Sequence, residues 1–120
     1  MQMATREDSP YIVVLTTIGS AEDAHAFVRA LVDQRLVACG TIVPGARSIY
    51  RWEGKIADEQ ESVVLLKTRR ERWDDLCSAV RELHPYKVPE LLALSVSDGL
   101  PAYLEWVSSE TISKEQEEGS

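Results

Sequence analysis

The side chains in this sequence that could hold a metal are soft sulfur and imidazole ligands, which copper prefers in proteins. They are Met1, Met3, His25, Cys39, Cys77 and His84. None has the spacing of a local metal site, because the chain contains no C-x-x-C, no H-E-x-x-H and no close His-x-His. A metal site would therefore have to be assembled by folding or between subunits.

Two of these ligands lie on one predicted helix. His84 directly precedes Pro85 at the helix end, where an imidazole serves either in a site or as a cap for the last carbonyls. Cys77 lies on the apolar stripe of the helix, which favours packing. His25 has only the pattern of an exposed helix position.

Catalytic motifs are absent from the sequence. There is no G-x-S-x-G and no GxxxxGK[ST] phosphate loop. The paired carboxylates Asp58-Glu59 and Asp74-Asp75 fall in polar positions, where solvated charge is the ordinary explanation. The sequence therefore predicts a protein that is not an enzyme.

Length and charge narrow the class further. The 120 residues fit one domain, and 20 acidic against 13 basic residues give a net charge of −7. This charge is opposite to that of nucleic-acid-binding surfaces. No apolar run reaches the roughly 20 residues needed to span a bilayer, and the N-terminal residues MQMATREDSP do not resemble a signal peptide. We expect a soluble cytoplasmic protein that binds neither nucleic acid nor membrane.

Hydrophobic periodicity and turn residues predict seven elements. They are a strand at 10–17, a helix from the Ser20 cap to about Arg35, a long strand at 37–52, a strand at 61–67, a helix opened by a Thr68 and Glu71 capping box and stopped by Pro85, a strand at 91–97 and a short helix from Pro101. Around a single domain at 10–108, we expect a disordered arm at 1–9 and a disordered acidic tail at 109–120.

The long strand from Val37 to Trp52 is the most informative element. Its sixteen residues would extend roughly 50 Å at ~3.3 Å per residue, whereas an ordinary strand has about five or six residues. Pro44-Gly45 predicts a bend or bulge inside it, and Glu53-Gly54-Lys55 a turn after it. The second half of this strand and its returning partner would project as an apolar ribbon that needs a partner subunit to cover it.

The predicted order β-α-β-β-α-β with an additional C-terminal helix is an α+β fold of the ferredoxin-like type. Two helices would then cover one face of an antiparallel sheet. Because the strands are apolar on both faces, we expect the second face to pack against other copies of the chain in a closed assembly.

Four motifs together resemble the divalent-cation tolerance (CutA) family. They are ACGTIVPGARSIYRWEGKI from Ala38, the ESVVLLKT segment at 61–68, HPYKVPE at 84–90 and PAYLEW at 101–106. The resemblance covers the chain from about Tyr11 to Val107 and implies a cytoplasmic homotrimer linked to tolerance of copper and other divalent metals. The family is also similar in architecture to PII signalling trimers, which bind small ligands in clefts between subunits.

The resemblance places Cys39 inside a family motif and makes it the preferred metal-ligand candidate, with His84 as the second. The alternative for Cys39 is burial as a small hydrophobic residue. Where many members have Cys-Val-Asn, this chain has Cys39-Gly40-Thr41, and where HHPYE is common it has Leu83 to Lys87, LHPYK. A site with several histidines is therefore not predicted, and no metal is expected to be an obligatory cofactor.

A second candidate site is a cleft between subunits that combines an aromatic wall, a cation and two carboxylates, as small-ligand pockets do. The matched motifs supply Trp52, Glu61, Lys67, Tyr86 and Glu90. The alternative is an oligomer interface in which Lys67 forms an ion pair with Glu61 or Glu90.

The sequence therefore predicts a cytoplasmic homotrimer for divalent-cation, above all copper, tolerance, which binds metal weakly or signals in response to it. One alternative is a PII-like module that binds a small anionic metabolite. Another is a trimeric scaffold or anchor for other proteins.

Overall fold

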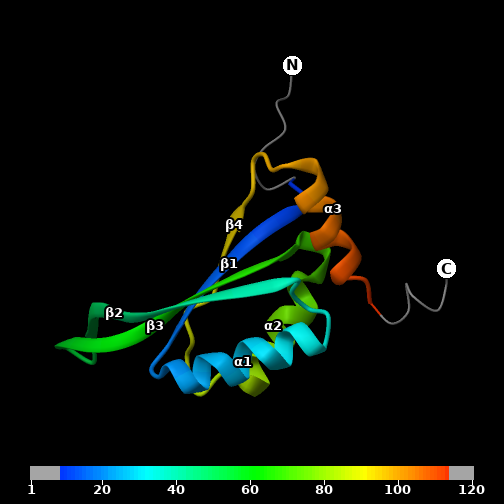
Figure 1. The fold of residues 1–120 in the computed structure, drawn as a ribbon. Helices are drawn as coiled ribbons and strands as arrows, with labels where there is room; N and C mark the ends of the chain where they lie inside the picture. Colours follow the sequence, from blue (N-terminus) through cyan, green and yellow to red (C-terminus); the bar gives the residue numbers. More distant parts are fainter. Residues whose placement is uncertain (1–8, 114–120) are drawn as a thin grey trace.

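The computed structural model describes residues 9–113, so the disorder predicted for 1–8 and 114–120 lies outside the described residues. The elements follow the chain as a split βαβ arrangement with a short 3-10 turn and a third helix (Figure 1). They are β1 (Tyr11–Ile18), α1 (Ala21–Asp33), β2 (Cys39–Trp52), β3 (Lys55–Arg69), η2 (Arg70–Arg72), α2 (Trp73–Leu83), β4 (Leu92–Ser95) and α3 (Pro101–Glu110).

The four strands form one antiparallel sheet in the order β2-β3-β1-β4. Helices α1 and α2 lie together against one face of it (Figure 1). Strand β1 alternates half-buried and buried residues, and its buried set packs with Leu31 of α1 and Leu76 of α2 in the core. This arrangement confirms the predicted ferredoxin-like α+β fold.

The first helix begins where the sequence predicts. The Ser20 side chain accepts a hydrogen bond from the backbone N–H of Asp23 at 3.0 Å, as an N-cap residue does. The helix ends at Asp33, and Arg35 then adopts a left-handed φ of 59°.

Strands β2 and β3 form the predicted ribbon, defined here as residues 46–61, which extends well beyond the two helices (Figure 1). A register shift between Val43 and Ala46, with Gly45 at a φ of +79°, confirms the bulge at Pro44-Gly45. The ribbon closes through Glu53 and Gly54, both with positive φ, as two-residue hairpin turns that follow strand twist require.

Two sequence predictions around β3 are wrong. Strand β3 begins at Lys55 and not at Glu61, because residues 55–61 pair with the second half of β2 in spite of their polar composition. The capping box also does not form. Thr68 is still part of β3, its hydroxyl donates to the Leu36 carbonyl at 2.7 Å, and the following 3-10 turn has no side-chain cap.

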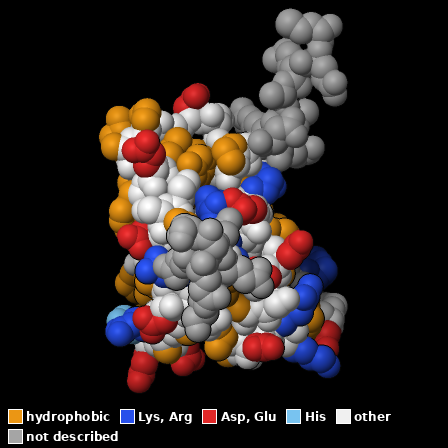
Figure 2. Space-filling view, turned by 90° about the vertical axis from the view of Figure 1, so that its right-hand side faces the viewer, with side chains coloured by type: hydrophobic (Ala, Val, Ile, Leu, Met, Phe, Trp, Pro, Cys, Tyr) orange, Lys and Arg blue, Asp and Glu red, His pale blue; other side chains and the backbone are white. Residues whose placement is uncertain are grey.

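The second face of the sheet is only partly covered. We call it the open face and define it by the side chains that alternate away from α1 and α2: Val13, Leu15, Thr17, Val63, Leu65, Lys67, Leu92 and Leu94. Helix α3 lies over one end of this face (Figure 1). In the side view of Figure 2, hydrophobic side chains gather in the upper part, and charged ones crowd the lower part at the height of α1 and α2.

Helix α3 is longer than the sequence predicts, since it runs past residue 108 to Glu110. Thr111 after it is fully buried, and the Arg69 guanidinium donates to its hydroxyl at 2.9 Å and to its carbonyl at 2.7 Å. At the other end of the chain, the Ser9 hydroxyl donates to the Val96 carbonyl at 2.6 Å. Among the described residues, no helix is long and apolar enough to cross a membrane.

Candidate functional site

A buried polar cluster lies where the loop after α2 passes the end of β1. The Tyr86 hydroxyl donates to the Glu61 carboxylate at 2.8 Å, and Glu61 is only 5% exposed. The rings of Tyr86 and His84 lie 4.9 Å apart, and Phe27 contacts His84 edge to face from α1. Two residues of the predicted cleft, Glu61 and Tyr86, are thus brought together within one protomer.

The charge state of Glu61 is set by competing effects. Burial raises the pKa of its carboxyl, and hydrogen bonds from Tyr86, Ser48 and Thr17 lower it. The net effect is a pKa below the ordinary 4.5. Burial and the same carboxylate raise the pKa of the Tyr86 hydroxyl, which remains a donor. Glu61 is therefore an anion held by neutral donors.

His84 is fully engaged inside the protomer and is 7% exposed. Its Nε2 lies 3.0 Å from the Thr17 carbonyl and 3.2 Å from the Thr16 hydroxyl, so this nitrogen carries the proton and donates. Its Nδ1 accepts from the backbone N–H of Tyr86 at 3.1 Å. In this arrangement neither nitrogen keeps a lone pair for a metal ion, so the structure does not support His84 as a ligand and favours its structural role.

The protein should become less stable as the pH falls below about 6.5, because His84 is buried in its neutral form. Burial holds the pKa of its imidazole below the ordinary 6.5, so the unfolded chain takes up the proton more readily. The contribution is complete above about pH 6.5 and is lost as pH falls from there towards the folded pKa. Glu61, whose pKa is also lowered, adds a further loss below its ordinary 4.5.

Denaturant unfolding at about pH 7.5 and about pH 5.5, at one protein concentration, tests this prediction. His84→Gln should be less stable at both pH values but should lose less on acidification than the unmodified protein. His25→Gln, which changes the exposed imidazole of α1, should keep the full loss. An equal loss in the unmodified protein and in His84→Gln would contradict the assignment.

Lys67 and Cys39 form a second polar contact, on the open face. The two residues are paired across β3 and β2, and the Lys67 Nζ lies 3.6 Å from the Cys39 sulfur while also donating to the Thr41 hydroxyl. Within residues 9–113 of one protomer, Lys67 forms no ion pair with Glu61 or Glu90, so the ion pairs predicted at a subunit interface stay a prediction. Glu61 is six residues along the same strand, roughly 20 Å away, and Glu90 forms no hydrogen bond or ion pair within residues 9–113.

The two predicted metal ligands are not neighbours in one protomer. Cys39 pairs with Lys67 on the open face, whereas His84 contacts the buried Thr16, which faces the helices and pairs with Val64. They therefore lie on opposite sides of the sheet. Among residues 9–113, no group of three or more His, Cys, Asp or Glu side chains is placed to hold a metal ion.

The remaining candidates lie elsewhere. Trp52, 56% exposed, is at the tip of the ribbon beside the turn, far from Glu61 and Lys67 in the same protomer. Burial raises the pKa of the Cys77 thiol, which keeps it in the neutral form that binds metals poorly. Cys77 is half-buried on α2, and its packing role stays a prediction.

Sequence reasoning missed two residues next to the candidates. Thr41 is two positions after Cys39 in the same strand, so the period of two was a sufficient signal that these two side chains share a face. The contact of Thr41 with Lys67 depends on strand register. Thr17 of β1 forms a side-chain hydrogen bond with the Glu61 carboxylate. No local motif indicated this contact.

Comparison with known proteins gives one consistent family. The family model described as CutA1 divalent ion tolerance protein matches residues 12–110. The divalent-cation tolerance protein CutA of Thermus thermophilus is 46% identical over 99 residues, which cover 82% of this chain and 96% of that protein. The crystal structure of CutA from Xylella fastidiosa superimposes with a TM-score of 0.83 at 41% identity, covering 86% of this chain and 99% of the other.

Relatives carry names that refer to different compartments. The chloroplastic protein CutA of Arabidopsis thaliana is 38% identical over 102 residues, which cover 85% of this chain and 56% of that protein. The structure of a periplasmic divalent cation tolerance protein CutA from Archaeoglobus fulgidus has a TM-score of 0.81 at 30% identity, covering 84% of this chain and 98% of the other. Membership therefore does not fix where a relative works. The matched length, the identity and the shared fold agree, and this chain belongs to the CutA1 divalent ion tolerance protein family.

Proposed function

We propose that the chain acts in divalent-cation tolerance as a homotrimer and that it binds metal ions weakly at Cys39. The observation that carries the proposal is the open face. Leu92 and Leu94 of β4 are 55% and 52% exposed there, next to half-buried Val13, Leu15 and Leu65. An apolar sheet face of this kind is typical of a surface that packs against another subunit.

The edges and the ribbon support the same proposal. Strands β2 and β4 are the two outer strands of the sheet, so each presents unpaired backbone groups along one edge. Ile49, Trp52 and Ile56 of the ribbon are 68%, 56% and 61% exposed. A cyclic assembly of identical copies would cover these surfaces without leaving an open end.

The geometry around Cys39 explains why metal binding would be weak. Cys39 is one soft donor, and the positive Lys67 ammonium 3.6 Å away repels an arriving cation. The family description names tolerance and no reaction, so we infer that the protein acts by binding and not by catalysis.

Copper titration of the reduced protein tests the role of Cys39. We expect low-affinity Cu(I) uptake that Cys39→Ser abolishes without changing the assembled mass. Cys77→Ser is the matched control, because Cys77 is also half-buried but lies on α2, and it should bind as the unmodified protein does. Unchanged uptake by Cys39→Ser would remove Cys39 from the metal response.

A further inference from the structure

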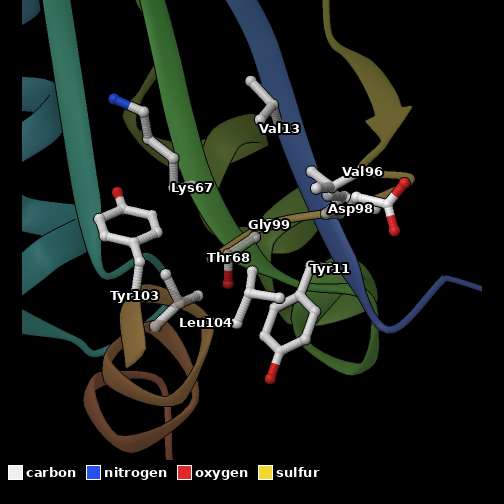
Figure 3. Close-up of a pocket in the computed structure, with 11 residues that line it drawn as sticks. Tyr11, Val13, Lys67, Thr68, Val96, Asp98, Gly99, Tyr103 and Leu104 are labelled. Atoms are coloured by element: carbon white, nitrogen blue, oxygen red, sulfur yellow. The ribbon is translucent and has the colours of Figure 1, made fainter. Parts of the chain in front are cut away.

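A cavity of about 290 Å³ lies between α3 and the end of the open face that α3 covers (Figure 3). We call it the α3 pocket. Its wall combines residues of β1, β3, the segment after β4 and α3, all from one protomer: Tyr11, Val13, Lys67, Asp98, Tyr103 and Leu104 are those used below. The volume is at the lower end of the ~300–1,000 Å³ common for small-molecule sites.

The apolar walls of the α3 pocket are held in place by the surrounding structure. The Tyr11 hydroxyl is 2.7 Å from the Ser108 hydroxyl, which fixes the Tyr11 ring against α3. Gly99 leaves room for Leu104, because a Cβ at this glycine would come within 2.9 Å of the Leu104 side chain. The cavity is therefore a preformed space, which lowers the cost of binding a ligand.

The polar groups of the pocket are arranged asymmetrically. Lys67 and Asp98 lie on opposite sides in Figure 3. Lys67 contacts only the Cys39 sulfur and the Thr41 hydroxyl within residues 9–113, and no carboxylate there is within ion-pair distance. An ammonium has three donors and a thiol is a weak acceptor, so Lys67 retains capacity for an anion. The exposed Asp98 carboxylate points away from the cavity in Figure 3.

We propose that the α3 pocket binds a small molecule with an apolar body and a single carboxylate, and that the carboxylate pairs with Lys67. The apolar body fills the space between Val13, Tyr103 and Leu104. The proposal goes beyond the cation-tolerance function. One protomer supplies every group named, and because Val13 and Lys67 belong to the open face, the proposal requires an assembly that leaves the α3 pocket open.

Three probes of one shape test the ligand class on the full-length protein: 3-phenylpropionate, neutral 3-phenylpropanamide and cationic 3-phenylpropylamine. Titrations followed by protein NMR should show saturable binding of the carboxylate at least about tenfold tighter than the amide, as charge-assisted hydrogen bonds allow. The amine should bind more weakly still. No saturable binding of any probe would overturn the proposal, and this is also the result expected if a neighbouring copy fills the pocket. Equal affinity for all three probes would overturn it as well.

Matched variants locate the binding. Val13→Phe should fill the cavity and abolish binding, whereas Leu15→Phe places the same ring on the same strand face two residues away, outside the lining, and should bind normally. Equal loss in both variants would overturn the location. The assembled mass is measured for each, so that a change in oligomeric state is recognised.

Charge variants provide a test that does not depend on repacking the cavity. Lys67→Gln should remove the preference for 3-phenylpropionate over its amide. Asp98→Asn, a change at an exposed residue on the opposite side, should bind the carboxylate as tightly or a few times more tightly. If Asp98→Asn weakens binding as much as Lys67→Gln does, the proposed orientation is wrong.

Discussion

Leu94→Lys should convert the assembled protein into a monomer whose protomer remains folded. Leu94 is 52% exposed within the protomer, so a lysine there can reach water and costs the isolated fold little. In an assembly that covers the open face, the same ammonium would be buried without a partner. Because such burial costs several kcal/mol per ion, association should weaken by more than about a hundredfold.

Light scattering after gel filtration measures the mass, and circular dichroism verifies the fold. The control is Val32→Lys on α1, which is 37% exposed on the opposite layer of the molecule. It should retain the mass of the unmodified protein. If Leu94→Lys keeps that mass as well, the open face is not the surface through which copies associate.

Leu76→Ala should lower the free energy of unfolding by about 2–5 kcal/mol. Leu76 is fully buried in the core cluster between α2 and the sheet. Removal of its side chain loses buried apolar area and leaves a cavity that the packed sheet and helices can fill only in part.

Leu83→Ala is the matched control on the same helix, because Leu83 is 39% exposed. It should cost about 1 kcal/mol or less. Both variants are compared by denaturant unfolding at one protein concentration, since the proposed association would also stabilise the fold. Equal losses for the two substitutions would contradict the assignment of Leu76 to the core.

The ribbon shows what local sequence can predict. β-branched and aromatic residues, the Pro44-Gly45 pair and the turn at Glu53-Gly54 are local signals, and the bulge and hairpin follow them. The start of β3 was missed because residues 57–60, ADEQ, have no apolar alternation. Their strand conformation comes from pairing with β2, which is a tertiary effect.

Thr68 shows how tertiary contacts override a local motif. A threonine three residues before a glutamate predicts a helix cap. In the fold, β3 continues past Thr68 and turns its hydroxyl towards the Leu36 carbonyl, a buried acceptor supplied by the segment after α1. A buried carbonyl needs a donor, and this requirement is invisible in the local sequence.

The candidate site was predictable only in part for the same reason. The motifs identified Glu61 and Tyr86, which contact each other, but not the path of the loop that joins them. That loop engages Nδ1 of His84, and β1 engages Nε2, whereas the sequence left His84 open between a site and a cap. Lys67 has its contacts with Cys39 and Thr41 because of strand register, a property of the pairing and not of spacing along the chain.

The most direct test of the central claim, a homotrimer built on the open face, is native mass spectrometry of the full-length protein. We expect a species of about 40 kDa, three times the 13.4 kDa chain mass. On dilution, this species should dissociate only at concentrations far below those at which the Leu94→Lys variant dissociates. A dominant 13.4 kDa species under the same conditions would contradict the account.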